Sequence, residues 1–325
     1  MAPCKRTTST LCLLVAAAAS STLVSAQTYP SRPIRLVAAF SAGSTSDILA
    51  RIIGPKLHES WGQPVVVENR PAAGGVVAGE IAARATPDGQ TLMITSSGFS
   101  ASAALYAKLP YDSVKDFAGV AQVATGSTVL VAAPAIGVKS VKELIALAKS
   151  KPGQLQYGSA GIGSGAHYVT ELFRLAAGIT VTHVPYKGAP EYLNDIAAGR
   201  LPFGFSPIPS TLSFINSGRV TALAVSGAAR SHVLPNVPTV AEGGLPEFSY
   251  SGWYGIFVAA ATPRRIVNQL SNEIGRIIAL PEINSAILKQ GETPQWIGAV
   301  AFDKMVHADI ATRRKVFSAA GVKPE

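Results

Sequence analysis

The sequence predicts an α/β protein of two lobes, each with a mostly parallel sheet flanked by helices. The first observation is the length of 325 residues, of which 48% are hydrophobic and 14% are charged. This suits about two units of ~100–200 residues and excludes a disordered chain or a highly charged coiled coil. The second observation is that short apolar runs alternate with helical patterns. This β-α-β rhythm is typical of mostly parallel sheets that are covered on both faces.

The expected elements follow this rhythm in order along the chain. A strand at residues 34–40 leads through a Ser/Gly turn into a helix at residues 45–57, and a capping box, Ser140-x-x-Glu143, opens another helix at residues 141–150. A further helix is expected at residues 76–85. Further strands are expected at residues 65–68, 91–95, 129–133, 156–158, 180–184, 201–205, 220–226 and 256–260.

The C-terminal part is mostly helical and is expected to return to the first lobe. Ile266, Leu270, Ile274 and Ile278 recur at four-residue spacing, which gives one apolar helix face. Pro281 opens the next helix and Gly291 closes it, while Met305, Ile310 and Phe317 mark the last helix. We therefore expect one lobe at residues 27–126, joined by residues 255–325, and a second lobe at residues 127–254. The cleft between two such lobes is a usual place for a small ligand.

The N-terminus has the pattern of a secretory signal peptide at residues 1–26. Lys5 and Arg6 precede a short apolar run, and small residues end at Ala26. The run is shorter than the ~20 residues of a membrane-spanning helix. Cys4 and Cys12 both lie in this segment, so we expect a periplasmic protein without disulfides, thiol catalysis or cysteine-ligated metals.

The charge of the mature chain gives little sign of a macromolecular partner. Removing the signal lowers the number of Lys and Arg from 28 to 26 against 19 acids, a net charge of +7. The basic residues are spread out, with no interleaved aromatics, so nucleic-acid binding is not expected. Nothing in the pattern signals a dimer, and we expect a monomer.

Two similar loops, one in each expected lobe, are candidate anion sites. Residues 41–47 (SAGSTSD) and 159–165 (SAGIGSG) each follow a strand and precede a helix. Small residues let the backbone turn tightly there and expose N–H groups at a helix N-terminus, where the helix dipole also favours an anion. Together the loops could hold two ends of a small dianion.

Each loop also has a simpler interpretation. Ser44-x-x-Asp47 matches a capping box, in which Asp47 only caps its helix. Gly161-x-Gly163-x-x-Ala166 matches the dinucleotide fingerprint, but residues 180–187 (TVTHVPYK) lack the acidic residue that binds the ribose. We therefore expect no dinucleotide cofactor.

Three common catalytic motifs are absent from the sequence. There is no G-x-S-x-G elbow, H-E-x-x-H helix or Walker loop, and the five histidines lack ligand spacing, so we expect no metal. Ser164 with His167 keeps open the alternative of a secreted hydrolase or lyase that acts on a small acid or ester. His167 could reach a ligand or pack locally, and Lys187 could face a carboxylate or solvent.

Taken together, several segments give the mature chain a resemblance to a known family. In this order they are highly specific, and the chain resembles the Bug family of periplasmic solute-binding proteins, which serve tripartite tricarboxylate transporters. The segments are Tyr29-Pro30-x-Arg32-Pro33-Ile34, residues 40–51, residues 67–75, residues 159–167, His183-Val184-Pro185-Tyr186-Lys187-Gly188, residues 234–242 and Gly252-Trp253-Tyr254-Gly255.

The resemblance implies a type II periplasmic binding protein, with two lobes joined by a two-strand hinge that close over a small carboxylate. It implies no catalytic residue, and a membrane permease as the partner that reads the closed form. Backbone amides, hydroxyls and waters would hold the carboxylates. The resemblance places these residues at or near the ligand: Phe40, Ser41, Gly43, Ser44, Asp47, Ser96, Ser97, Ser159, Gly161, Gly163, Ser164, His167, Tyr186 and Lys187.

Three positions depart from the family pattern. Ala39 stands where the family usually has Pro, and Gly43-Ser44 stands where it has a Gly-Gly pair. Ser206, which we include in the expected site, stands where many relatives have Asp. Because that Asp can favour an amine or hydroxyl on the ligand, its loss disfavours amino acids and leaves a dicarboxylate, an aromatic acid or an amide.

Overall fold

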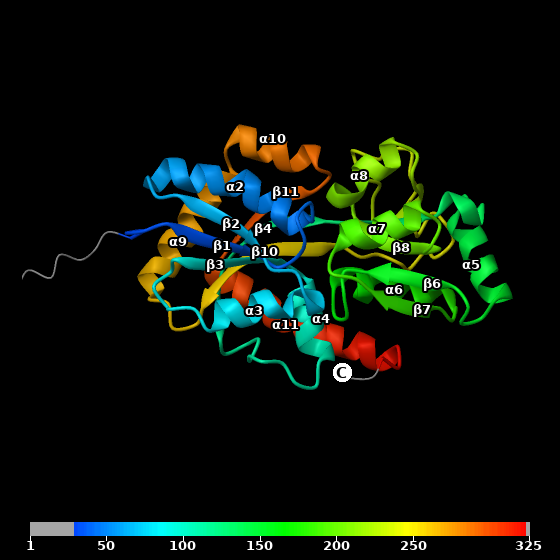
Figure 1. Cartoon of the computed structure of the whole chain (residues 1–325), viewed down its shortest axis with the longest axis horizontal. Coiled ribbons are helices and arrows are strands. Elements are labelled where there is room, and N and C mark those ends of the chain that lie inside the picture. The colour runs from blue at the N-terminus through cyan, green and yellow to red at the C-terminus, as the bar shows by residue number, and fades with distance from the viewer. Residues whose placement is uncertain (1–28, 323–325) are drawn as a thin grey trace, which may run out of the picture.

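The protein consists of two lobes that lie side by side (Figure 1). The computed structural model describes residues 29–322, so the predicted signal peptide at residues 1–26 lies outside the described part. Within residues 29–322, no helix combines the length and apolar character that crossing a membrane requires.

The first lobe is built on a six-stranded sheet with the strand order β11-β4-β10-β3-β1-β2. Strand β1 pairs in parallel with β2 and β3, whereas β10 pairs antiparallel with β3 and β4, and β4 pairs antiparallel with β11. The strands are β1 (Ile34–Ala38), β2 (Val65–Asn69), β3 (Thr91–Ser96), β4 (Phe117–Gly126), β10 (Gly252–Ala259) and β11 (Thr293–Gly298).

The second lobe is built on a five-stranded sheet with the order β7-β6-β8-β5-β9. Strand β6 pairs in parallel with β7 and β8, and β5 pairs antiparallel with β8 and β9. The strands are β5 (Thr128–Ala132), β6 (Gln156–Ser159), β7 (Thr182–Pro185), β8 (Phe203–Pro207) and β9 (Thr221–Val225).

The α/β class with two helix-covered sheets is confirmed, but the prediction of mostly parallel sheets is wrong in detail because both sheets are mixed. Strands β4, β5 and β10, which pair antiparallel with their neighbours, lie next to the passages between the two sheets, and β11 and β9 add antiparallel pairs with β4 and β5. The chain leaves the first sheet at Gly126 and enters the second at Thr128, and it returns with β10. Because these strands cross between lobes without an intervening helix, they need not run parallel to their neighbours.

Helices cover both faces of the first sheet. In Figure 1, α2 and α10 lie above this sheet and α3, α4 and α11 lie below it. The predicted apolar face of α9 is confirmed, since Ile266, Leu270, Ile274 and Ile278 are all buried. The helices are α2 (Thr45–Trp61), α3 (Val76–Ala83), α4 (Gly98–Leu105), α9 (Arg264–Ile278), α10 (Pro281–Lys289) and α11 (Ala299–Ala319), with a short 3-10 turn η1 (Ala73–Gly75) before α3.

The second sheet has its own helices, and its hydrophobic core also receives the end of α11. Phe317 of α11 packs in the same buried cluster as Tyr157 and Phe173, and the Ala320 carbonyl accepts a hydrogen bond from the Arg174 guanidinium. The last helix therefore bridges both lobes, as the red helix in Figure 1 shows. The helices of this lobe are α5 (Val141–Ser150), α6 (Gly165–Ala177), α7 (Ala189–Ala197) and α8 (Ile208–Asn216), with η2 (Pro134–Ile136) after β5.

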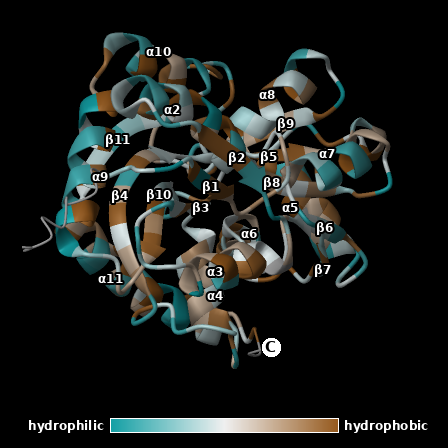
Figure 2. Cartoon of the chain, turned by 60° about the vertical axis from the view of Figure 1, so that its left-hand side comes forward, coloured by the Kyte–Doolittle hydropathy of each residue, from teal (hydrophilic) through white to brown (hydrophobic). Residues whose placement is uncertain are grey.

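Hydropathy follows this layered arrangement. Figure 2 shows hydrophobic residues concentrated on the strands and the inward sides of the helices, with hydrophilic residues on the outer helices. Burial of this apolar area supplies the main stabilising free energy, at about 25 cal/mol per Å².

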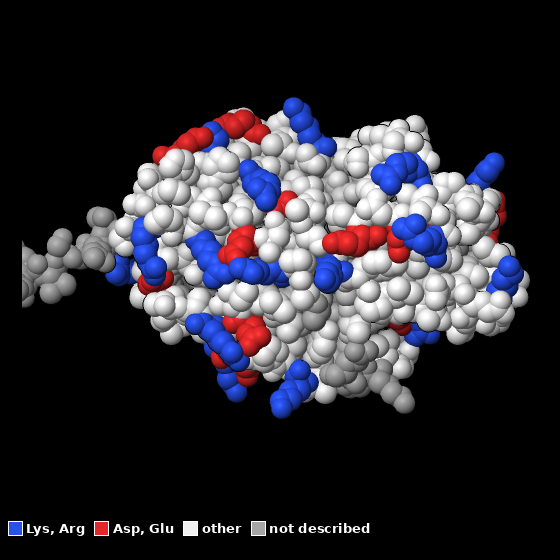
Figure 3. Space-filling model, in the orientation of Figure 1, with Lys and Arg blue, Asp and Glu red and all other residues white. Residues whose placement is uncertain are grey.

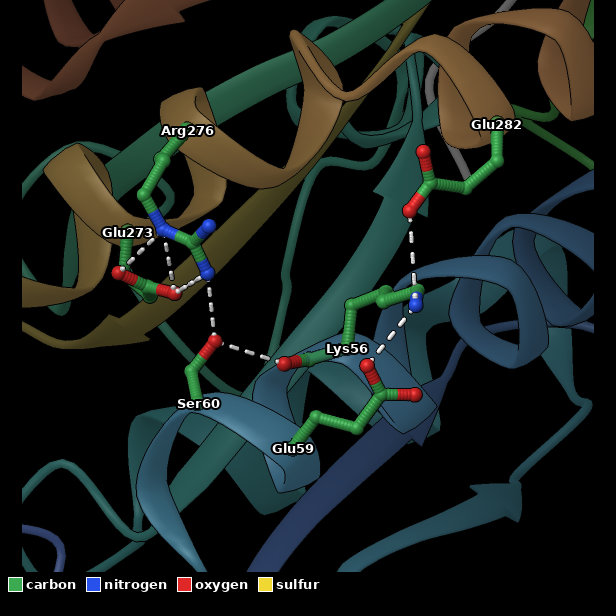
Figure 4. Close-up of polar contacts among 6 residues, drawn as sticks. All are labelled: Lys56, Glu59, Ser60, Glu273, Arg276 and Glu282. Atoms are coloured by element: carbon green, nitrogen blue, oxygen red, sulfur yellow. Dashed lines mark hydrogen bonds and ion pairs between the residues drawn. The ribbon is translucent and has the colours of Figure 1, made fainter.

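Charged residues lie at the surface and pair locally. Figure 3 shows Lys, Arg, Asp and Glu scattered over the visible face, with no single extended patch of one sign. In Figure 4, Lys56 of α2 reaches Glu59 and Glu282, while Arg276 of α9 binds Glu273 and the Ser60 hydroxyl, at 2.6 Å and 2.7 Å. These exposed pairs join α2 to α9 and α10, and each contributes only about 0–1 kcal/mol.

Candidate functional site

A cavity lies between the two lobes, where the crossing strands meet the carboxyl ends of the parallel strands. Its volume is about 50 Å³ for the centre of a water-sized sphere, so this conformation has room for a small molecule. The lining residues come from both lobes: Phe40, Ser44, Thr45, Ser46, Ser96, Ser97, Gly126, Thr128, Ala160, Ser164, Gly165, Ala166, Ala189, Pro207, Ser210, Tyr250, Gly252 and Tyr254.

Five helices begin at this cavity. Ser44 is the N-cap of α2, Ser97 the N-cap of α4 and Ser164 the N-cap of α6. Helix α7 begins at the lining residue Ala189, and α8 follows the lining residue Pro207. The first turns of these helices carry N–H groups without intrahelical partners and the positive ends of the helix dipoles. The cavity is therefore a favourable environment for an anion.

The polar groups of the cavity are hydroxyls. None of the 18 lining residues has a charged side chain. Ser97 and Tyr250 bond to each other through their hydroxyls at 3.0 Å. The hydroxyls of Ser46 and Ser210 are buried and have no partner among the described residues. Such groups are commonly satisfied by a ligand or by water.

In the first predicted loop, Phe40 and Ser44 line the cavity but their neighbours have other contacts. The Ser44 hydroxyl accepts from the Asp47 amide at 3.4 Å, which is the predicted helix cap. The Asp47 carboxylate accepts from the Gly43 amide at 2.9 Å and from Arg51 at 3.0 Å, so it fixes the turn. Ser41 donates to Glu191 of α7, at 2.5 Å. Ser41, Gly43 and Asp47 therefore lie outside the lining.

In the second loop, Ser164 lines the cavity together with Gly165, and the other expected residues lie behind them. The Ser164 hydroxyl accepts from the His167 amide at 3.2 Å. The Ser159 hydroxyl is buried and lies 2.6 Å from His183 Nε2. Gly161 and Gly163 turn with φ of 111° and 71° and are packed against residues of the first lobe.

The remaining expected residues divide in the same way. Ser96 and Ser97 line the cavity. The Tyr186 hydroxyl donates to Asp195 at 2.6 Å, and Lys187 is exposed outside the lining. Ser206 is fully buried at the end of β8 and also lies outside the lining.

Several lining residues were not predicted from the sequence. Thr45 and Ser46 follow the predicted Ser44 directly, and the helix start itself was the available signal. Thr128 and Tyr254 come from the crossing strands, Tyr250 from the loop just before β10, and Ser210 from α8. No local pattern marks them, because only the pairing of distant strands brings them to the cavity.

His167 belongs to a buried aromatic stack on the inner side of α6. Its ring lies 4.2 Å from the ring of His183 with an interplanar angle of 5°, and Phe317 of α11 lies 5.6 Å away. Its Nδ1 accepts from the Gly163 amide at 3.2 Å. Burial, and to a smaller extent the nearby Arg174, lowers the pKa of His167 to about 4. Of the two alternatives left by the sequence, the structure shows local packing.

The neutral state of His167 predicts a loss of stability in acid. The unfolded imidazole takes up a proton near its ordinary pKa of 6.5, whereas the folded one stays neutral down to about 4. The contribution of His167 to the free energy of unfolding should therefore be constant above pH 6.5 and fall as the pH drops toward 4, by about 3 kcal/mol. Urea unfolding of His167→Asn, which keeps an acceptor, should show a smaller fall.

The exposed His58 supplies the matched control for this prediction. His58→Asn should keep the full acid dependence of the wild type. If His167→Asn also keeps it, His167 is not the cause.

The two lobes touch around the cavity. A Cβ placed on Gly74 of the first lobe would lie 2.2 Å from the Ile162 carbonyl oxygen of the second. One placed on Gly98 would lie 3.2 Å from the Gly165 nitrogen. The Ser102 hydroxyl donates to the Gly163 carbonyl at 3.3 Å. The described conformation is therefore closed, with glycines where the lobes approach most closely.

Known proteins share this arrangement. Residues 49–322 match the family model TctC, described as the tripartite tricarboxylate transporter family receptor. Protein BugT of Bordetella pertussis is 36% identical over 284 residues, which is 87% of each chain. A structure of an R. palustris protein with adipate has a TM-score of 0.88 at 32% identity, covering 91% of this chain and 100% of that chain. MatC from Rhodopseudomonas palustris with bound malate has a TM-score of 0.84 at 28% identity, covering 89% and 99%.

Proposed function

The chain belongs to the tripartite tricarboxylate transporter receptor family, and from this premise we propose that it captures a small carboxylate between its two lobes for a membrane permease. The lobes close around the ligand, and the closed form is the one that the permease recognises. Ligand binding then acts by shifting the equilibrium between open and closed forms.

The observation that carries the proposal is the cavity, which is built to bind an anion without a cationic side chain. Helix N-termini and hydroxyls converge there, and none of the lining side chains is charged. Hydrogen bonds from neutral N–H and O–H groups to a carboxylate are charge-assisted and stronger than neutral ones. Adipate and malate, which are bound in the two similar structures, are both small carboxylates of the kind that such a cavity would hold.

We extend the proposal to the ligand-contacting residues. Within the predicted set, Phe40, Ser44, Ser96, Ser97 and Ser164 lie at the cavity and are proposed to touch the ligand. Ser46 and Ser210 join them, because their buried hydroxyls have no partner among the described residues. The other residues of the predicted set are proposed to hold the two loops in place through the contacts described above. They are Ser41, Gly43, Asp47, Ser159, Gly161, Gly163, His167 and Tyr186.

We also propose a periplasmic location after cleavage at residue 26, a monomer, and no enzymatic activity. For the alternative of a secreted hydrolase, Ser164 would have to be the nucleophile and His167 its base. The Ser164 hydroxyl instead caps α6, and the His167 ring stacks on His183 away from the lining. A nucleophile needs its base within hydrogen-bond reach.

Mass spectrometry tests this function directly. Protein secreted with its own signal and purified from the periplasm is denatured, and the released small molecules are identified. We expect a small carboxylate in about equimolar amount, unchanged after long incubation with the protein. A bound molecule without a carboxyl group, or turnover of an added ester or acid, would contradict the proposal.

A further inference from the structure

Glu292 is a fully buried acid whose carboxyl group has no partner. It lies between α10 and β11 with 0% of its surface exposed, and both carboxyl oxygens lack a hydrogen-bond partner among the described residues. Buried carboxyl groups are normally paired or hydrogen-bonded, since an unpaired charge in such a place is very unfavourable. This carboxyl group therefore needs an explanation.

The carboxyl group lies beside the ligand cavity, at the point where the chain crosses between lobes. A Cβ placed on Gly126 would lie 1.5 Å from Glu292 Oε2, so the carboxyl group fills the space over that glycine. Gly126 ends β4, pairs with Gly252 of β10, and lines the cavity. Tyr254, another lining residue, is close enough for Glu292 to raise the pKa of its hydroxyl, after the larger effect of burial.

Both lobes cover this group. The neighbouring Gly291 packs on Ile208 and Val233 of the second lobe, and a Cβ there would lie 2.7 Å from each. His232 Nε2 lies 2.6 Å from the Leu288 carbonyl oxygen at the end of α10. Residues of the second lobe therefore pack directly against the segment that carries Glu292.

Within residues 29–322, no charged group offsets the burial of Glu292. The titratable neighbour on β10 is Tyr254. On the segment before residue 233 it is His232, whose ring lies against the Leu288 carbonyl, and on α10 it is the exposed Lys289. The other neighbours, Gly126, Ile208 and Val233, have no titratable side chain. Burial alone raises the pKa of Glu292 from 4.5 to about 8, so the closed form holds this carboxyl group neutral at pH 7.

We propose that Glu292 is a proton site coupled to the ligand cavity, so that closing the lobes over one carboxylate also takes up one proton from solvent. The proposal rests on the proposed function for the identity of the ligand. In the open form the carboxyl group meets water and ionises, and on closing one of its oxygens takes a proton. The neutral group then does not repel the bound anion, and the proton returns to water when the lobes open.

The sign of the coupling follows from the two forms. Below the ordinary carboxyl range both forms are protonated, and above about pH 8 both are ionised. Between these limits closure binds one proton, so the affinity for an anion should fall up to tenfold for each unit of rising pH. The affinity of Glu292→Gln should not depend on pH in this way.

Isothermal titration calorimetry with adipate tests the coupling. Titrations at pH 7 in two buffers of different ionisation enthalpy give the number of protons taken up on binding. We expect a value near one for the wild type and for Glu282→Gln, an exposed acid on α10, and near zero for Glu292→Gln. If Glu292→Gln does not fold, Glu292→Met takes its place and should also take up no proton. Equal uptake in wild type and Glu292 variants, or none in the wild type, overturns the proposal.

A second measurement separates this proposal from the proposed function. If adipate does not bind any variant, the choice of ligand fails, and the proton uptake is measured in the same way with malate, the acid bound in the other similar structure. Uptake near one in the wild type and near zero in Glu292→Gln supports the proton site, whereas equal uptake overturns it. If neither acid binds, the proposed function fails, and the proton site that rests on it fails with it.

Discussion

Replacing Gly74 with alanine is expected to weaken ligand binding about 10- to 100-fold while leaving the melting temperature nearly unchanged. The new methyl group would lie 2.2 Å from the Ile162 carbonyl oxygen of the opposite lobe. A rigid backbone clash of this kind typically costs about 1–3 kcal/mol, and each 1.4 kcal/mol changes an affinity tenfold. The clash exists only when the lobes are closed, so it opposes closure and not folding. Titration with adipate and thermal unfolding measure the two effects.

Gly62 provides the matched control for this variant. Its φ of 68° is close to the 65° of Gly74, so alanine is strained to a similar degree at both positions. At Gly62, however, no atom lies within 4 Å of the added Cβ. Gly62→Ala should lower stability slightly and leave affinity unchanged. If both variants lose affinity equally, backbone strain and not lobe contact is responsible.

Filling the cavity should abolish binding. Ala166 lies in the first turn of α6, is buried, and lines the cavity. Leucine at this position adds three carbon atoms to the lining of this small cavity, which takes up space that the ligand needs. We expect at least a 100-fold loss of affinity, about 3 kcal/mol or more, with little loss of stability, as measured by calorimetry and thermal unfolding.

Ala176 on the same helix is exposed and supplies the control. Ala176→Leu should bind like the wild type. Undiminished binding by Ala166→Leu would mean that the ligand lies elsewhere.

Local patterns in the sequence were sufficient to predict much of the fold. The four-residue spacing of Ile266, Leu270, Ile274 and Ile278 identified the buried face of α9. The predicted serine caps at Ser140 and Ser44 were also confirmed, since each serine side chain accepts from the amide three residues later. The acids Glu143 and Asp47 accept from the amide of the residue before the serine, and not from that of the serine itself. These features depend on residues close together in the chain.

Two elements with a weak local pattern were missed. Strand β4, with the sequence FAGVAQVATG, and α4, with the sequence GFSASAAL, are rich in small residues and carry a weak periodic signal.

Contacts between distant residues were also missed. The bond from Ser41 to Glu191 joins residues 150 positions apart. Local patterns cannot reveal such a contact, which explains why Ser41 was expected at the ligand.

The same limit applies to the candidate site. The helix starts at Ser44 and Ser164 could be found from glycine- and serine-rich loops, and both lie at the cavity. Tyr254 of β10, and Tyr250 just before it, reach the cavity only because the chain crosses between the lobes at this point. His167 follows its loop in sequence, but its ring turns to the buried stack with His183.

The most direct test of the account is calorimetric titration of the purified protein with succinate, malate, adipate and benzoate, each compared with its amide. The account predicts saturable binding of one molecule for at least one acid and at least 100-fold weaker binding of the matching amide, because neutral donors at helix N-termini select a negative charge. Equal binding of an acid and its amide, or binding of none of the acids, would contradict it.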